Sequence, residues 1–86
     1  MSYEIRFSRS AAKHLAHLKA ARLDGKLRAL LDIIREAPFQ SPPPLEKLKG
    51  LENVWSRRLN VQHRLVYHVD DEAKRIKILS VWTHYE

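Results

Sequence analysis

The chain has 86 residues, 44% of them hydrophobic and 30% charged, which predicts a single globular domain over residues 1–86 and excludes a disordered chain. It contains no cysteine and no apolar run near the ~20 residues of a membrane span, which excludes disulfides, thiolate metal sites and a transmembrane helix and fits a reducing cytoplasm. A net charge of +6 favours an acidic partner, nucleic acid above all, although a solvated surface would also account for it.

The chain begins with a predicted strand and a first helix. Apolar and polar residues alternate from Tyr3 to Phe7, which is typical of a half-buried strand. Ser8 or Ser10 is expected to cap the helix that follows. The apolar face of this helix is predicted at i, i+4, i+7 and i+11, which are Ala11, Leu15, Leu18 and Arg22.

A second helix is predicted after Gly25, which indicates a break or a tight joint, and Asp24 is a plausible cap for it. Its apolar stripe consists of Leu27, Leu30, Leu31 and Ile34. Pro38 is expected to end it, because proline lacks the amide donor and clashes with the preceding turn. The prolines at 42–44 predict a stiff, extended loop, and residues 45–50 a short helical turn.

The second half of the chain predicts strands. Residues 55–67 read as two strands joined by a tight turn near Asn60, because apolar residues recur at alternate positions. A second turn is expected at residues 70–72, and the last strand at residues 75–82. On that last strand we expect Ile76, Ile78 and Trp82 on one face and Leu79 and Val81 on the other. The predicted fold is therefore α+β: a strand, two helices and a three-stranded antiparallel meander, with both helices packed on one face of the sheet.

The predicted hairpin carries Arg57, Arg58, His63 and Arg64. Positive charge is costly in the middle of a sheet unless one face remains hydrated. We therefore expect one face, bearing Arg57 or Arg58 together with Arg64, to bind phosphate, and the predicted phosphate contacts are Lys49, Arg57, Arg58 and His63.

Two further features carry chemistry, Glu46 on a loop beside Lys49 and the pair His84-Tyr85 after the last strand. Together with the hairpin arginines they supply what metal-free RNA cleavage needs. A base removes the proton of the 2′-hydroxyl, an acid protonates the departing 5′-oxygen, a cation stabilises the charged phosphorane, and a ring holds the nucleobase.

Each of these residues also has a simpler interpretation. Glu46 would be a solvated loop carboxylate, and His84 an exposed residue near the C-terminus without a role. His14 and His17 stand at i and i+3 of a helix and have the spacing of metal ligands, but acidic or thiol ligands are lacking nearby in the sequence. We predict no metal site and no cofactor.

Several short motifs occur in one order along the chain. They are Ala37-Pro38-Phe39 at a predicted helix exit, Leu48-Lys49 followed by Trp55-Ser56-Arg57-Arg58, then His63-Arg64-Leu65-Val66-Tyr67, and finally His84-Tyr85. Taken together, they resemble the YoeB/Txe branch of the RelE superfamily, the toxins of bacterial toxin–antitoxin pairs. The resemblance covers nearly the whole chain and implies a RelE-like microbial-RNase fold.

This resemblance implies a ribosome-dependent endonuclease that cleaves mRNA in the A site without a metal ion and thereby inhibits translation. By position, it implies that Glu46 is the general base, His84 the general acid, Arg64 the catalytic arginine and Tyr85 the residue that orients the substrate, and that Lys49 and Arg58 contact phosphate.

The resemblance also implies partners: a cognate antitoxin of the YefM/Axe type, the ribosome with its mRNA, and a second copy of the chain in a possible homodimer. No membrane is expected to take part. The alternative is a non-catalytic toxin that binds nucleic acid or DNA gyrase, since the superfamily includes relatives that act on gyrase. Glu46 and the His84-Tyr85 pair discriminate between the two, because a pure binder does not need them.

Overall fold

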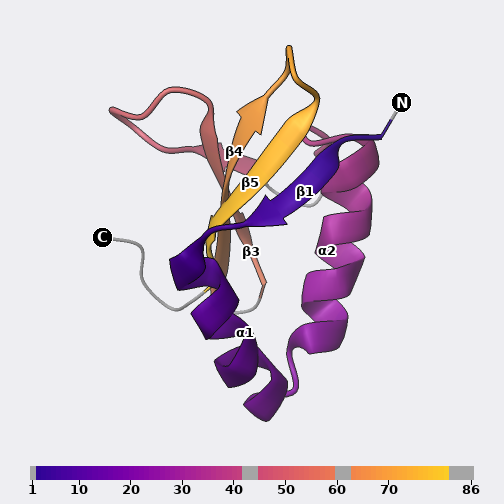
Figure 1. The fold of residues 1–86 in the computed structure, drawn as a ribbon, viewed down its shortest axis with the longest axis vertical. Coiled ribbons are helices and arrows are strands. Elements are labelled where there is room, and N and C mark those ends of the chain that lie inside the picture. The colour runs from indigo at the N-terminus through magenta and orange to yellow at the C-terminus, as the bar shows by residue number, and fades with distance from the viewer. Residues whose placement is uncertain (1, 42–44, 60–62, 82–86) are drawn as a thin grey trace.

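The computed structural model describes residues 2–41, 45–59 and 63–81 of the chain. In chain order the elements are β1 (Glu4–Phe7), α1 (Arg9–Ala20), α2 (Asp24–Glu36), β2 (Leu45–Lys47), β3 (Val54–Arg58), β4 (Arg64–Asp70) and β5 (Arg75–Ser80). Figure 1 shows their arrangement. None of the helices in the described ranges is long and apolar enough to cross a membrane.

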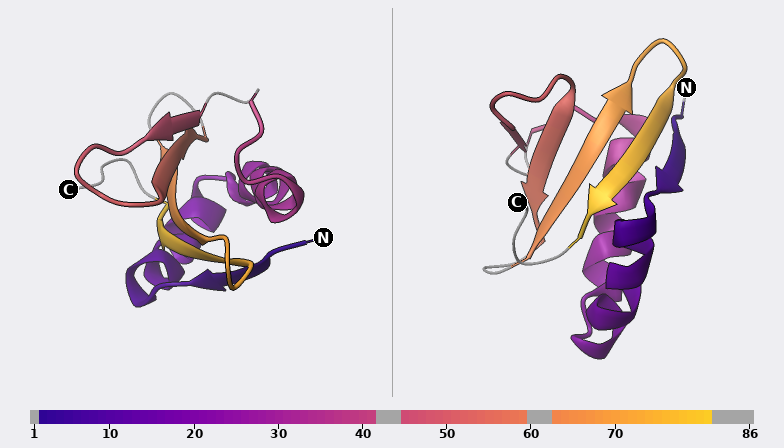
Figure 2. Two further views of the ribbon diagram at one scale, coloured as in Figure 1. Left: turned by 90° about the horizontal axis from the view of Figure 1, so that it is seen from above. Right: turned by 60° about the vertical axis from the view of Figure 1, so that its left-hand side comes forward.

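The strands form one five-stranded sheet in the order β1-β5-β4-β3-β2. β1 runs parallel to β5 and the other pairs are antiparallel, so that β3, β4 and β5 form the predicted meander. Figure 2 shows both helices on the same side of the sheet. The predicted α+β fold, with its order of elements, is therefore confirmed.

The edge strand β2 is the main departure from the prediction. Leu45 pairs with Arg57 and Lys47 pairs with Trp55, so these residues extend the sheet instead of forming the helical turn expected at 45–50. An isolated helical turn gains few hydrogen bonds for the residues that it orders. The edge of β3, by contrast, provides backbone donors and acceptors for a whole antiparallel strand. The proline loop at 42–44 and the hairpin turn near Asn60 lie outside the described residues.

The start of α1 and the end of α2 follow the prediction. The Ser8 hydroxyl accepts a hydrogen bond from the Ala11 N–H (3.1 Å) and so caps α1. α2 ends at Glu36, and Ala37 has left the helical conformation with φ −146° and ψ 80°. The ring of Pro38 disfavours a helical conformation in the residue before it, which accounts for this end point.

The joint between the helices differs from the prediction. α1 ends at Ala20, and Arg22 beyond it is exposed with a φ of 60°, so Arg22 does not belong to the apolar face of α1. α2 begins at Asp24 and contains Gly25 in its first turn. The cap position is taken by Leu23, without a side-chain hydrogen bond, so that Asp24 is not the cap. Leu23 is buried in the core, and this burial sets the start of the helix.

The hydrophobic core lies between the helices and the sheet. The helices and their joint contribute Ala11, Leu18, Leu23, Leu27, Leu30 and Ile34, and β4 and β5 contribute Leu65, Tyr67, Val69, Ile76 and Ile78. Residues that alternate with these along the strands point to the opposite surface, which we call the open face. By strand register the open face carries Glu4, Arg6, Glu46, Val54, Ser56, Arg58, Arg64, Val66, His68, Asp70, Arg75 and Lys77, of which Val54, Ser56 and Val66 are buried.

A β-bulge changes which face the end of β5 presents. The register between β4 and β5 shifts between Val66 and Tyr67, so that β5 carries an extra residue there. An extra residue reverses the alternation beyond it. Val81 is therefore buried in the core, not on the face of Leu79 as predicted. Trp82 lies outside the described residues.

Candidate functional site

An ion pair joins two strands that are not neighbours in the sheet. Arg64 begins β4 and Glu46 is the middle residue of β2, with β3 between them. The Arg64 guanidinium nitrogen lies 3.2 Å from a Glu46 carboxylate oxygen. Both side chains remain accessible, with 36% and 62% of their surfaces exposed. The pair therefore presents a cation and a carboxylate together on the open face.

Ser56 lies on β3, the strand between the two that carry the ion pair. Glu46 pairs with Ser56 on one side, and Val66 pairs with Ser56 on the other. Neighbouring strands lie about 4.8 Å apart, so β2 and β4 are separated by about twice that distance. The Arg64 side chain reaches Glu46 diagonally across β3, where Arg58 lies opposite Arg64 and the short Ser56 lies opposite Glu46. The Ser56 hydroxyl is buried, and it has no hydrogen-bond partner among the described residues.

Arg58 adds a second guanidinium to the same surface. It ends β3 directly opposite Arg64, and it is exposed. Like charges at opposed positions of two strands repel each other, so an anion placed between them is attracted by both. Lys49 lies in the connection between β2 and β3 and is also exposed. A cavity of 370 Å³ is lined by residues 47–52 of this connection.

Arg57 is a correction to the predicted phosphate-binding residues. Its side chain points to the helix side of the sheet and the residue is 1% exposed. Its guanidinium donates hydrogen bonds to the Tyr67 hydroxyl (3.0 Å) and to the carbonyl oxygens of Pro38 (3.1 Å) and Gln40 (2.6 Å). A guanidinium held in this way is not accessible to phosphate, and we withdraw Arg57 from the predicted set.

The sequence offered a signal for this placement. Arg57 shares its parity with Trp55 and Leu59, which both pack against the core. Alternation along β3 therefore puts Arg57 inside and Arg58 outside. The sequence-based prediction gave more weight to the charge of Arg57 than to its position on the strand.

His63 also differs from the prediction. It immediately precedes β4 and is 7% exposed, so its ring offers little surface to phosphate in this structure. Its carbonyl oxygen accepts a hydrogen bond from the Leu59 N–H (2.8 Å), which closes the base of the β3–β4 hairpin. His84 and Tyr85 lie outside the described residues, so that their predicted roles stay predictions.

His14 has a structural contact that the sequence did not predict. Its Nδ1 accepts a hydrogen bond from the Val81 N–H (3.3 Å), which joins α1 to the residue after β5. Burial lowers the pKa of His14, with a smaller contribution from the neighbouring His17. A neutral imidazole is needed for Nδ1 to accept, so both observations favour the uncharged ring.

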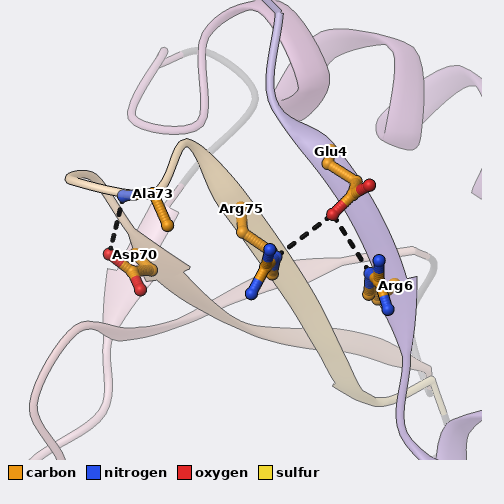
Figure 3. Close-up of polar contacts among 5 residues, drawn as sticks. All are labelled: Glu4, Arg6, Asp70, Ala73 and Arg75. Carbon is orange, nitrogen blue, oxygen red and sulfur yellow. Dashed lines mark hydrogen bonds and ion pairs between the residues drawn. The ribbon is translucent and has the colours of Figure 1, made fainter.

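The far end of the open face carries a second cluster of charged side chains. Figure 3 shows the Glu4 carboxylate between two guanidinium groups, those of Arg6 and Arg75, each at 3.1 Å. Hydrogen bonds from Arg6 and from Arg75 lower the pKa of Glu4. Asp70, the last residue of β4, accepts a hydrogen bond from the Ala73 N–H in the following turn (3.1 Å). Here one carboxylate contacts both guanidinium groups, whereas at the other end Glu46 contacts Arg64 and Arg58 lies opposite Arg64.

The chain is similar in sequence to known toxins. The family described as "YoeB-like toxin of bacterial type II toxin-antitoxin system" matches residues 7–85. The toxin YoeB of Escherichia coli strain K12 is 40% identical over 65 residues, which is 74% of this chain and 75% of that protein.

Solved structures show the same fold. YoeB from Staphylococcus aureus superposes with a TM-score of 0.83 as a dimer, at 35% identity, covering 99% of this chain and 100% of that one. The same toxin in a YoeB–YefM complex gives a TM-score of 0.79 at 36% identity with equal coverage. The archaeal RelE–RelB complex from Pyrococcus horikoshii gives a TM-score of 0.80 at 26% identity over 96% of both chains.

Proposed function

Because the chain belongs to the YoeB-like toxins of bacterial type II toxin–antitoxin systems, we propose that it is a ribosome-dependent mRNA endonuclease that cleaves in the A site and inhibits translation. The observation that supports this most directly is the ion pair of Glu46 and Arg64 on the open face. It places a carboxylate and a guanidinium within one hydrogen-bond length of each other, at an accessible position.

In the proposed reaction Glu46 acts as general base. It takes the proton of the ribose 2′-hydroxyl, and the 2′-oxygen attacks the adjacent phosphorus. Arg64 orients the Glu46 carboxylate and stabilises the negative charge that develops on the phosphorane. The bond from phosphorus to the 5′-oxygen then breaks, and His84 protonates that oxygen while Tyr85 orients the substrate. No metal ion is needed in this scheme, because its base, acid and cation are all side chains.

Arg58 and Lys49 are the proposed phosphate contacts. Both are exposed, and Arg58 stands directly across from Arg64. Contacts of this kind fix the register of a nucleic acid without reading its sequence. We therefore assign them to holding the mRNA backbone, with the ribosome supplying the rest of the binding surface.

The proposed partners are a YefM/Axe-like antitoxin and a second copy of the chain. The related toxin from Staphylococcus aureus is found both with YefM and as a dimer. An acidic antitoxin segment that folds on binding would cover Lys49, Arg58 and Arg64 while the toxin is inactive.

The experiment that tests this function is primer extension on a defined mRNA bound to purified 70S ribosomes. Wild type should give A-site cuts, and Glu46→Ala and His84→Gln should abolish or greatly slow them. Lys26→Ala, which removes an exposed charge from α2, serves as the control. Cutting at the wild-type rate by both site variants would refute the assigned roles.

A non-catalytic toxin that binds nucleic acid or DNA gyrase is the second candidate. Its supporting observation is that Glu46 and Arg64 already satisfy each other, as an exposed surface pair would. In that case toxicity would persist in Glu46→Ala and His84→Gln. The toxin would then either stop translation without cutting mRNA or inhibit gyrase.

A further inference from the structure

The segment that follows α2 is fastened to the helix side of the sheet. The Arg57 guanidinium donates to the carbonyl oxygens of Pro38 (3.1 Å) and Gln40 (2.6 Å). The Tyr67 hydroxyl donates to the same Pro38 oxygen (2.8 Å) and accepts from the Arg57 Nε (3.0 Å). Phe39 lies between these two residues, and its ring packs edge-on against the ring of Trp55, with the ring centroids 5.2 Å apart. Residues 38–40 therefore each contact a side chain of the central strands.

This arrangement carries a buried charge. Arg57 is 1% exposed and Tyr67 is fully buried. In this buried position the Arg57 guanidinium donates to oxygens of Pro38, Gln40 and Tyr67. Burial raises the pKa of the Tyr67 phenol, so its proton remains available for the Pro38 carbonyl. Well-packed apolar residues often stabilise a site of this kind as well as buried polar groups do. Stability alone therefore does not explain an arginine here.

The strand that carries Arg57 also pairs with the strand that carries Glu46. Leu45 pairs with Arg57 itself, and the next residue, Glu46, pairs with Ser56. β2 is three residues long and lies at the edge of the sheet, next to β3. So short a strand has little order of its own and depends on what fixes its neighbours. Arg57 and Tyr67 hold residues 38–40, which come before β2 in the chain, against β3 and β4.

We propose that Arg57 and Tyr67 are positioning residues, which act from the helix side of the sheet to hold β2, and with it Glu46, beside Arg64. This inference rests on the proposed function, because it takes Glu46 as the group whose position limits the reaction. Misplacing a catalytic group by about 1 Å slows a reaction on the order of 10²-fold. Tyr67 and Arg57 touch no substrate in this scheme and act only through Glu46.

A double-mutant cycle tests the coupling to Glu46. Tyr67→Phe keeps the ring and removes the hydroxyl, and we expect it to lower the single-turnover rate of mRNA cleavage on ribosomes by about 10- to 100-fold. The affinity for ribosomes should change less than about twofold, since the open face is untouched. In a Glu46→Gln background the same substitution should have no further effect. Tyr3→Phe, which removes an exposed hydroxyl that binds Asp71, should leave the rate unchanged.

Two outcomes of the cycle would overturn the inference. One is an equal loss of rate from Tyr67→Phe in both backgrounds, which would indicate general destabilisation. The other is the wild-type rate in Tyr67→Phe and in Arg57→Met, since Arg57→Met removes the hydrogen bonds to Tyr67, Pro38 and Gln40 and keeps an apolar side chain in the site.

Amide hydrogen exchange tests the same inference without relying on activity. In wild type the Leu48 N–H donates to the Val54 carbonyl oxygen (3.0 Å) and reports on the β2–β3 ladder. Exchange across residues 45–48 should be at least about tenfold faster in Tyr67→Phe and Arg57→Met, while β5 keeps its wild-type rate. Unchanged exchange at 45–48 would refute the positioning role. If the exchange result holds but wild type cuts no mRNA, the proposed function fails and the coupling to β2 stands.

Discussion

Glu46 and Arg64 meet at 3.2 Å although the strands that carry them are not adjacent. The contact passes over β3 at Ser56, the residue that pairs with Glu46 on one side. Exposed ion pairs of this kind contribute only about 0–1 kcal/mol to folding. The pair therefore adds little to stability, and we propose that its role lies in the reaction.

The size of Ser56 should control the ion pair. Ser56→Leu places a branched side chain between Glu46 and Arg64, and we expect cleavage on ribosomes to fall on the order of 10²-fold because the carboxylate is displaced. Ser56→Ala is the matched control. It removes a buried hydroxyl that has no partner in the described part of the chain, so activity and melting temperature should stay near wild type. Equal activity of the leucine and alanine variants would contradict the arrangement described here.

Arg64→Ala should impair the chemical step more than binding. Loss of one preorganised donor to a developing negative charge typically slows a reaction about 10²–10³-fold. Single-turnover cleavage on saturating ribosomes measures this step directly. Arg75→Ala is the control, because Arg75 is another open-face arginine, paired with Glu4 at the far end of the sheet. If saturating ribosomes restored the wild-type cleavage rate in Arg64→Ala, Arg64 would contribute to binding instead.

Much of the fold follows from alternation and helix periodicity in the sequence. The helices and the meander were predictable because their apolar residues recur with the right period, as at Leu27, Leu30 and Ile34. β2 was not, because a strand of three residues shows no period and forms only where β3 offers an edge. Val81 was misplaced for a related reason, since a bulge reverses alternation and leaves no mark in the sequence.

The candidate site was predictable in composition but only partly in geometry. Glu46 and Arg64 stand 18 positions apart in the sequence, and only the register of the strands brings them together. Arg57 could have been placed inside from its parity with Trp55, but its hydrogen bonds to Pro38 and Gln40 depend on the path of the chain after α2. Such long-range contacts are invisible to local patterns.

Arg58 and Lys49 should govern the salt dependence of ribosome binding. Each phosphate contact contributes about one unit to the slope of log affinity against log salt, because a counterion is released. Arg58→Ala and Lys49→Ala should each lower that slope by about one unit and weaken binding at low salt. Lys26→Ala removes the same charge from the exposed surface of α2 and should leave the slope unchanged. An equal change in all three variants would show that only net charge matters.

His14 should make the fold sensitive to mild acid. Burial lowers the pKa of His14 in the folded chain below its ordinary value of 6.5. The unfolded chain therefore takes up a proton at a higher pH than the folded one does, and stability falls as the pH drops through and below 6.5. Above that pH the stabilisation is complete, because both states are neutral. Protonation also removes the acceptor for the Val81 N–H, so the contact between α1 and the end of β5 is lost together with stability.

His14→Asn tests this origin of the pH dependence. The asparagine side-chain oxygen can replace Nδ1 as acceptor for the Val81 N–H and does not titrate. Urea unfolding at pH 7.5 and at pH 5.5 should show a smaller loss of free energy of unfolding in His14→Asn than in wild type. His17→Asn, on the exposed side of α1, should weaken the dependence only slightly, since His17 is the smaller cause of the lowered pKa of His14. A wild-type pH dependence in His14→Asn would mean that other groups account for the acid sensitivity.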